Sequence, residues 1–144
     1  MDPASLFQIA NPIALVGWVV LLASPFIPKI ADRVSGLAIP LLFGVAYTGL
    51  IMAFWSSGQG GFDSLANVAL LFETPELLLA GWIHYLAFDL FVGAWIARTA
   101  REEGIRFWFV VPCLALTFLF GPAGYLLFNA IRAARLSTAT TAAA

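Results

Sequence analysis

Four stretches of this chain are long, apolar and almost free of charge, and they restrict what it can fold into. They cover residues 12–27, 36–55, 75–97 and 107–131. Over the whole chain 62% of the residues are hydrophobic and 10% are charged, whereas a soluble domain has about 45–50% apolar and about 25% charged residues. Since about 20 apolar residues in a helix cross a bilayer, the sequence predicts an all-α protein, an integral membrane four-helix bundle.

Proline, glycine and polar residues indicate where these spans begin and end. Asn11 is a plausible N-cap for a first helix that begins at Pro12, because proline is tolerated at the first helical position. Pro28 follows the end of that span and cannot continue a helix. Residues 56–61 have the composition of a flexible linker. In residues 62–72 apolar side chains recur at helical spacing over a run too short to cross a bilayer, which predicts a short interfacial helix between spans two and three.

The length predicts one four-span membrane domain over residues 1–136, followed by a flexible Ser/Thr/Ala tail over residues 137–144. The short connections after spans one and three hold five basic residues, the segment after span four holds two, and the N-terminal segment and the long connection hold none. The positive-inside rule therefore places the two short connections in the cytoplasm. Four crossings would put both termini on the other side of a membrane that we expect to be a bacterial inner or photosynthetic membrane.

The third span holds the only histidine of the chain, His84, and an aspartate, Asp89. An aspartate in the middle of a membrane helix costs at least ~2.5–3.5 kcal/mol, so it persists where it faces a bundle interior, a partner or a cavity. At about 100° per residue, Asp89 shares one face with Tyr85 and Trp82, while His84 and Phe88 lie on the opposite side. His84 and Asp89 are therefore not expected to pair along this helix.

Two interpretations of Asp89 follow. It positions, protonates or deprotonates a hydroxyl or epoxide of an apolar ligand, or it hydrogen-bonds a neighbouring span and stabilises the bundle. His84 has three interpretations: an acid–base group, a ligand to a metal or to a pigment magnesium, or a packed interfacial histidine.

The fourth span contains breaks of its own. Pro122 removes a backbone hydrogen bond and predicts a kink near Phe118. A kinked, small-residue segment that faces span three would open a slot for a flat, elongated ligand. The residues expected to contact that ligand are Trp82, Phe88, Thr117, Phe120, Gly121 and Pro122.

Charge and cysteine content exclude several classes of function. The formal net charge of −1 argues against nucleic acid as a partner, because phosphate binding needs a basic face. The single cysteine, Cys113, leaves no internal disulfide. One Cys and one His cannot complete a zinc site, and no spacing typical of another metal is present, so no metal is predicted.

Two segments together resemble a known family. Residues 82–93 carry a His-Tyr-x-x-x-Asp motif, and residues 112–124 carry a Thr-x-x-x-Gly-Pro motif. They resemble the abscisic-acid-deficient-four-like family, multi-spanning proteins of photosynthetic organisms and bacteria, over about residues 11–132. The plant member is required to make neoxanthin from violaxanthin, an epoxide opening that yields an allene. Ala94 stands where we would expect a basic residue, which removes one anchor for a polar ligand end.

The resemblance implies a carotenoid-related integral membrane protein. The expected activity is that of an epoxide-opening xanthophyll isomerase, with His84, Asp89 and Tyr85 as the acid–base residues. The alternative is a non-catalytic carotenoid-binding or accessory subunit of a membrane pigment–protein complex, and a permeation unit built by oligomerisation is a third hypothesis. The expected partners are the lipid bilayer, a carotenoid as substrate or bound pigment, and a larger photosynthetic complex or a homo-oligomer.

Overall fold

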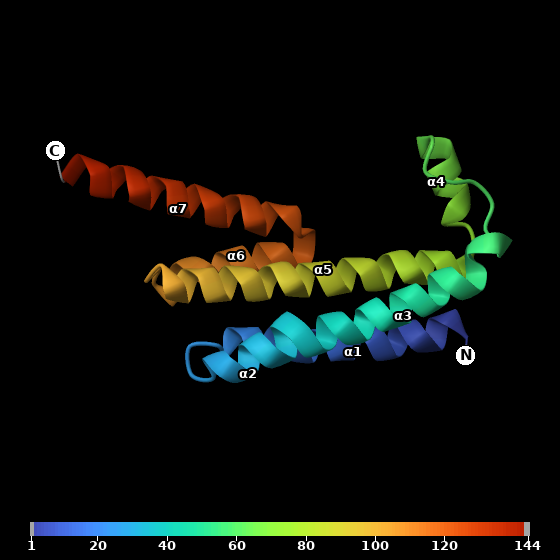
Figure 1. Ribbon diagram of the computed structural model, residues 1–144, viewed down its shortest axis with the longest axis horizontal. Coiled ribbons are helices and arrows are strands. Elements are labelled where there is room, and N and C mark those ends of the chain that lie inside the picture. The colour runs from blue at the N-terminus through green and yellow to red at the C-terminus, as the bar shows by residue number, and fades with distance from the viewer. Residues whose placement is uncertain (1, 143–144) are drawn as a thin grey trace.

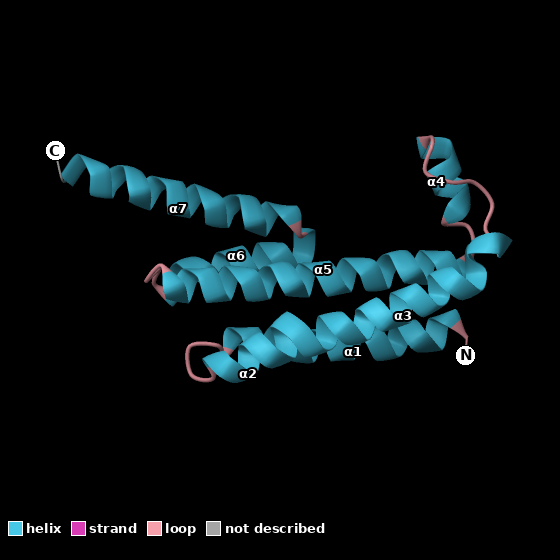
Figure 2. Ribbon diagram, viewed as in Figure 1, coloured by secondary structure: helices cyan, strands magenta, loops and turns pink. Residues whose placement is uncertain are grey.

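The computed structural model describes residues 2–142 and consists of helices joined by short connections (Figure 1). The elements in chain order are α1 (Pro3–Leu22), α2 (Pro28–Arg33), the π-helical turn η1 (Val34–Ala38), α3 (Ile39–Phe54), the 3₁₀ turn η2 (Trp55–Ser57), α4 (Leu65–Leu71), α5 (Pro75–Glu102), α6 (Phe107–Phe120) and α7 (Pro122–Ala142). No strand occurs among the described residues (Figure 2). The predicted all-α class is confirmed.

Three long helical segments form the body of the molecule. They are Pro3–Leu22, Pro28–Ser57 and Pro75–Glu102, and each is long and apolar enough to cross a membrane. They run side by side in alternating directions (Figure 1). The chain is therefore a multi-pass membrane protein, with a further, shorter apolar helix at Phe107–Phe120.

The fourth apolar stretch differs from the expected single kinked span. The chain reverses direction after α6, and α7 runs back toward the end of α5 (Figure 1). Two contacts establish this return: Arg132 pairs with Glu103, and Arg135 donates to the carbonyl oxygen of Gly104. The 14 residues of α6 extend about 21 Å, less than the ~30 Å of a hydrocarbon core. We call α6 and α7 together the hairpin, and residues 120–122 its tip.

The backbone at the tip explains the reversal. Gly121 has φ 45° and ψ −93°, a conformation that a residue with a Cβ rarely adopts. Pro122 follows and has no N–H with which to continue the hydrogen-bond ladder of α6. Gly124 then packs directly on α6, where a Cβ would overlap Thr117 Oγ1 and the carbonyl oxygen of Cys113.

The prediction that both termini lie on one side is wrong, because α1 begins and α7 ends at opposite ends of the bundle (Figure 1).

The predicted start of the first helix also needs correction. Helix α1 begins at Pro3, where Asp2 Oδ2 accepts a hydrogen bond from the Ser5 N–H at 3.3 Å. Asn11 is not the N-cap; it lies inside α1, and Pro12 is tolerated within the helix. The short helix predicted over residues 62–72 is present as α4, and Ser64 is its N-cap.

Helix α5 is the centre of the packing and contacts α1, α3 and α6. Glycines let α1 approach it closely: a Cβ on Gly17 would lie 2.6 Å from a methyl carbon of Leu90, and a Cβ on Gly93 would lie 2.8 Å from the ring of Trp18. Small residues at such positions are how membrane helices reach close contact.

The two ends of the bundle carry opposite charge. The connection between α1 and α3 meets the end of α5 through an ion pair, Arg101 Nη2 to Asp32 Oδ1 at 2.6 Å, and the hairpin returns to the same end. All seven Lys and Arg residues of the chain lie in the segments that meet at this basic end, namely α2, the end of α5 with the connection to α6, and the part of α7 that contacts residues 103 and 104: Lys29, Arg33, Arg98, Arg101, Arg106, Arg132 and Arg135. The other end, which we call the acidic end, holds Asp2, Asp63, Glu73 and Glu76. Its Asp63 carboxylate accepts hydrogen bonds from Asn67 Nδ2 at 2.9 and 3.0 Å, which lower the pKa of Asp63.

Candidate functional site

A buried carboxyl group lies near the middle of α5, under the tip of the hairpin. Asp89 is only 9% exposed. A Cβ on Gly121 would lie 2.6 Å from Asp89 Oδ1, so the absence of a side chain at Gly121 makes room for the carboxyl group. Oδ2 is buried and has no hydrogen-bond partner among the described residues. An unpaired buried carboxyl oxygen is costly, which marks this position as a candidate for function.

Tyr85 lies one helical turn before Asp89 on the same face of α5, as the periodicity predicts. Its hydroxyl donates to the carbonyl oxygen of Leu119 at 3.1 Å. This hydrogen bond joins α5 to the last turn of α6. Tyr85 and Asp89 are therefore brought together at the tip of the hairpin, and we call them the Tyr85–Asp89 pair.

Trp82 extends this face toward the acidic end. Its indole stacks on the Tyr85 ring, with centroids 5.3 Å apart and an interplanar angle of 27°. Trp82 Nε1 donates to Asn11 Oδ1 of α1 at 2.9 Å, and the Phe7 ring lies 5.6 Å from the indole. These contacts hold Trp82 between α1 and the Tyr85–Asp89 pair.

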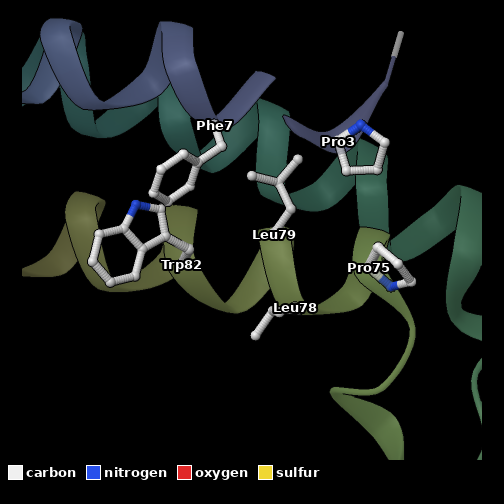
Figure 3. Close-up of a pocket in the computed structure, with 6 residues that line it drawn as sticks. All are labelled: Pro3, Phe7, Pro75, Leu78, Leu79 and Trp82. Atoms are coloured by element: carbon white, nitrogen blue, oxygen red, sulfur yellow. The ribbon is translucent and has the colours of Figure 1, made fainter. Parts of the chain in front are cut away.

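An apolar groove of about 320 Å³ continues from Trp82 between α1 and α5. Figure 3 shows Phe7 facing Trp82 at one end of the groove and Pro3 near Pro75 at the other. The remaining lining residues are Leu78 and Leu79. Because the hairpin turns back at Gly121, α6 does not cover the N-terminal half of α5, which lines the groove (Figure 1). The groove therefore leads from the acidic end toward the Tyr85–Asp89 pair.

The other predicted ligand contacts take separate positions at the hairpin. Thr117 is fully buried, and its hydroxyl donates to the carbonyl oxygen of Cys113 at 2.8 Å, so it packs α6 against α7. Phe120 is 63% exposed, and Pro122 is also exposed. Gly121 lies directly against the Asp89 carboxyl group.

His84 and Phe88 lie on another face of α5, as the helical spacing predicts. The imidazole stacks on the Phe88 ring, with centroids 4.7 Å apart, and meets the Tyr47 ring of α3 edge-on at 5.5 Å. Both His84 and Phe88 are exposed. The three predicted acid–base residues therefore divide into the Tyr85–Asp89 pair and a separate His84.

Sequence reasoning missed three contributors to this region: Phe7, the Asn11 side chain and the Leu119 carbonyl group. Asn11 offered a signal, because an amide inside an apolar helix needs a partner, but it was interpreted as a cap. Phe7 and the Leu119 carbonyl group offer no signal in the sequence. In residues 2–142 no three His, Cys, Asp or Glu side chains gather closely enough to hold a metal ion.

Comparison with known proteins gives one result. The family model described as ABA DEFICIENT 4-like matches residues 5–128, which confirms the resemblance stated from the two motifs. The comparisons with curated proteins and with solved structures gave no match.

Proposed function

Because the chain belongs to the ABA DEFICIENT 4-like family, whose members are linked to carotenoid synthesis, we propose that it is a membrane enzyme that opens the epoxide of a xanthophyll by isomerisation. The observation that carries the proposal is the Tyr85–Asp89 pair next to Trp82, which lines the apolar groove and stacks on Tyr85. The apolar chain of the substrate would lie along Leu78 and Trp82, with its oxygenated ring at Tyr85.

The pair has the chemistry that the isomerisation requires. The Tyr85 hydroxyl gives its proton to the epoxide oxygen as the carbon–oxygen bond breaks. The Asp89 carboxylate takes a proton from the adjacent polyene carbon, and the electrons of that carbon–hydrogen bond form the second double bond of the allene. Asp89 then returns a proton to Tyr85, one turn away. Atoms and electrons balance without an oxidant or a reductant, and His84 takes no part.

The tip of the hairpin must move for this chemistry. Gly121 lies directly on Asp89, so the ring of a substrate reaches the carboxyl group only when the tip moves outward. The hydrogen bond from Tyr85 to the Leu119 carbonyl oxygen breaks in the same step, which frees the hydroxyl to donate to the epoxide.

The charge distribution supports an orientation. All seven Lys and Arg residues lie at the basic end, so the positive-inside rule places that end, including the short connections and the end of α7, in the cytoplasm. The substrate then enters from the outer half of a bacterial inner or photosynthetic membrane.

One observation favours a second candidate function, a non-catalytic carotenoid-binding or accessory subunit. Asp89 is covered by the tip, and the groove itself is lined by apolar and aromatic side chains. A groove of this kind binds an apolar chain without requiring any reaction.

The test is expression in a host that accumulates violaxanthin, followed by analysis of total and protein-bound pigment. Catalysis predicts a new allenic carotenoid that is lost in Asp89→Asn and Tyr85→Phe and retained in His84→Phe. Phe88→Leu, an exposed substitution on another face of α5, is the matched control. Unchanged violaxanthin bound to the purified protein supports the accessory function instead. If the host contains no new carotenoid and the purified protein holds no pigment, both functions are contradicted.

A further inference from the structure

A second pocket, of about 300 Å³, lies on the His84 side of α5. It is formed at the acidic end by α3, α5 and residues 55–72, which lead from η2 through α4. Its lining includes five rings, those of Tyr47, Trp55, Phe62, Phe72 and His84. We call it the aromatic pocket. Three other grooves on the described surface are lined by apolar and aromatic side chains and glycine alone, so the aromatic pocket differs in containing an imidazole and a phenol.

Tight packing of residues 55–72 builds the outer wall of the pocket. The Phe72 ring sits on Gly81, where a Cβ would lie 2.9 Å from Phe72 Cε1. Gly58 packs against the side chain of Leu77 in the same way. The Trp55 and Phe62 rings contact each other with centroids 5.4 Å apart. The connection between α3 and α5 therefore contacts α5 through Phe72 and Gly58, and the pocket beside it stays open, with the Trp55, Phe62 and Phe72 rings partly exposed.

Three polar groups in this pocket have no hydrogen-bond partner among residues 2–142. The Tyr47 hydroxyl, the Trp55 indole N–H and the His84 ring nitrogens make ring contacts only. His84 lies nine positions after Pro75, about 13–14 Å along α5. The ~42 Å length of α5 exceeds a ~30 Å hydrocarbon core by about 6 Å at each end. His84 therefore lies inside the apolar layer, where a bound ligand rather than bulk water would complete its hydrogen bonds.

The charge around the pocket restricts what it can bind. The acidic end holds no Lys or Arg in the described part of the chain, and Asp63 and Glu73 directly follow two of the pocket's aromatic residues, Phe62 and Phe72. An anionic head group would be repelled. Tyr, Trp and His can each donate a hydrogen bond, so the pocket is suited to a neutral ring that carries acceptor oxygens.

We propose that the aromatic pocket binds the neutral, oxygen-bearing ring of a lipid-soluble molecule. His84 and Tyr47 hydrogen-bond the ring oxygens, and the surrounding aromatic rings pack on the faces of the ligand ring. The volume is at the lower limit of ligand pockets, so the head group occupies it and the apolar tail lies in lipid. A quinone head group and the hydroxylated end ring of a carotenoid share this chemistry. The site is separate from the Tyr85–Asp89 pair and does not depend on its function.

The test measures binding to the full-length protein in lipid nanodiscs by quenching of tryptophan fluorescence. Decylubiquinone is compared with decylbenzene, which has a ring and the same tail without the oxygens and so reports on partition into lipid. Zeaxanthin is compared with β-carotene in the same way. The variants are His84→Phe and Tyr47→Phe, which keep the rings and remove the polar atoms, with Asp89→Asn as a control at the other site.

The proposal expects tighter binding of at least one oxygenated probe than of its matched hydrocarbon. It also expects affinity about fivefold lower in each of the two variants, the usual effect of losing one hydrogen bond, and unchanged affinity in Asp89→Asn. The probe whose binding weakens in His84→Phe shows whether the bound ring is that of a quinone or that of a carotenoid. Equal affinity within both pairs of probes, or unchanged affinity in both His84→Phe and Tyr47→Phe, overturns the proposal. Equal weakening in Asp89→Asn overturns it as well, because the ligand would then occupy the Tyr85–Asp89 site.

Discussion

The second and fourth apolar stretches have similar composition but opposite outcomes. The second, which includes η1 and α3, contains Pro40, Gly44 and Gly49 and still forms one continuous helical segment. The fourth contains Gly121 and Pro122 and folds back on itself. Proline alone does not account for the difference, because Pro12 and Pro112 lie inside α1 and α6. The positive φ of Gly121 and the close packing of Gly124 against α6 make the fourth stretch a hairpin instead of a single membrane-crossing helix.

Gly124→Leu is expected to have the largest effect on this comparison. A side chain at Gly124 has no room beside Thr117 and the Cys113 carbonyl group, so α7 could not close on α6. We expect a loss of roughly 3 kcal/mol or more in the free energy of unfolding, the upper range for overpacking, measured by denaturation in detergent. Gly44→Ala is the matched control on α3, because nothing lies within 4 Å of a Cβ there. Equal stability of the two variants would show that the hairpin does not need close packing at Gly124.

Gly121→Ala is expected to have the next largest effect. The new Cβ is strained by the backbone conformation and meets the Asp89 carboxyl group. A strained φ/ψ costs about 1–3 kcal/mol, so the melting temperature should fall, and any xanthophyll isomerisation should fall further because the tip is displaced. A variant as stable and as active as the parent protein would mean that the tip takes another conformation.

Tyr85→Phe removes the hydrogen bond to the Leu119 carbonyl oxygen and keeps the stacking on Trp82. We expect a loss of about 1 kcal/mol in stability and complete loss of isomerisation, as the acid is gone. Phe88→Leu, an exposed substitution on another face of α5, should retain product formation in the same host. Unchanged product formation in Tyr85→Phe would remove Tyr85 from the mechanism and leave it a structural role.

The smallest expected effect is at the base of the hairpin. Arg132 hydrogen-bonds Glu103 and lowers the pKa of that carboxyl group below 4.5. The pair therefore contributes its stability above pH 4.5 and loses that contribution as the pH falls through the lowered pKa of Glu103. Because the Glu103 carboxylate is exposed and Arg132 is only half-buried, we expect a slight acid-induced loosening of α7, measured by hydrogen exchange. Glu103→Gln should abolish this pH dependence, and the same dependence in that variant would contradict the assignment.

The sequence predicted the parts of this fold that depend on local pattern. Apolar length predicted the three long membrane helices, and helical spacing predicted that Asp89 joins Tyr85 and Trp82 while His84 points elsewhere. The reversal at Gly121 could not be predicted, because a Gly-Pro pair is compatible with a kink as well as with a turn, and the choice depends on how α7 packs against α6. The contact of Asn11 with Trp82 joins residues 71 positions apart, which no local pattern reports.

The arrangement of the hairpin is the central claim, because it leaves the groove open and brings the tip onto Asp89. The most direct measurement is the labelling of single cysteines in intact spheroplasts, in a Cys113→Ala background, with a reagent that does not cross the membrane. One cysteine is placed near Ser5, one in the connection at Gly104 and one at Ala133 of α7. The account predicts labelling of the first alone and equal protection of the other two until the membrane is permeabilised. Labelling at Ala133 together with Ser5, with Gly104 protected, would mean that residues 107–131 cross the membrane, and it would contradict the hairpin.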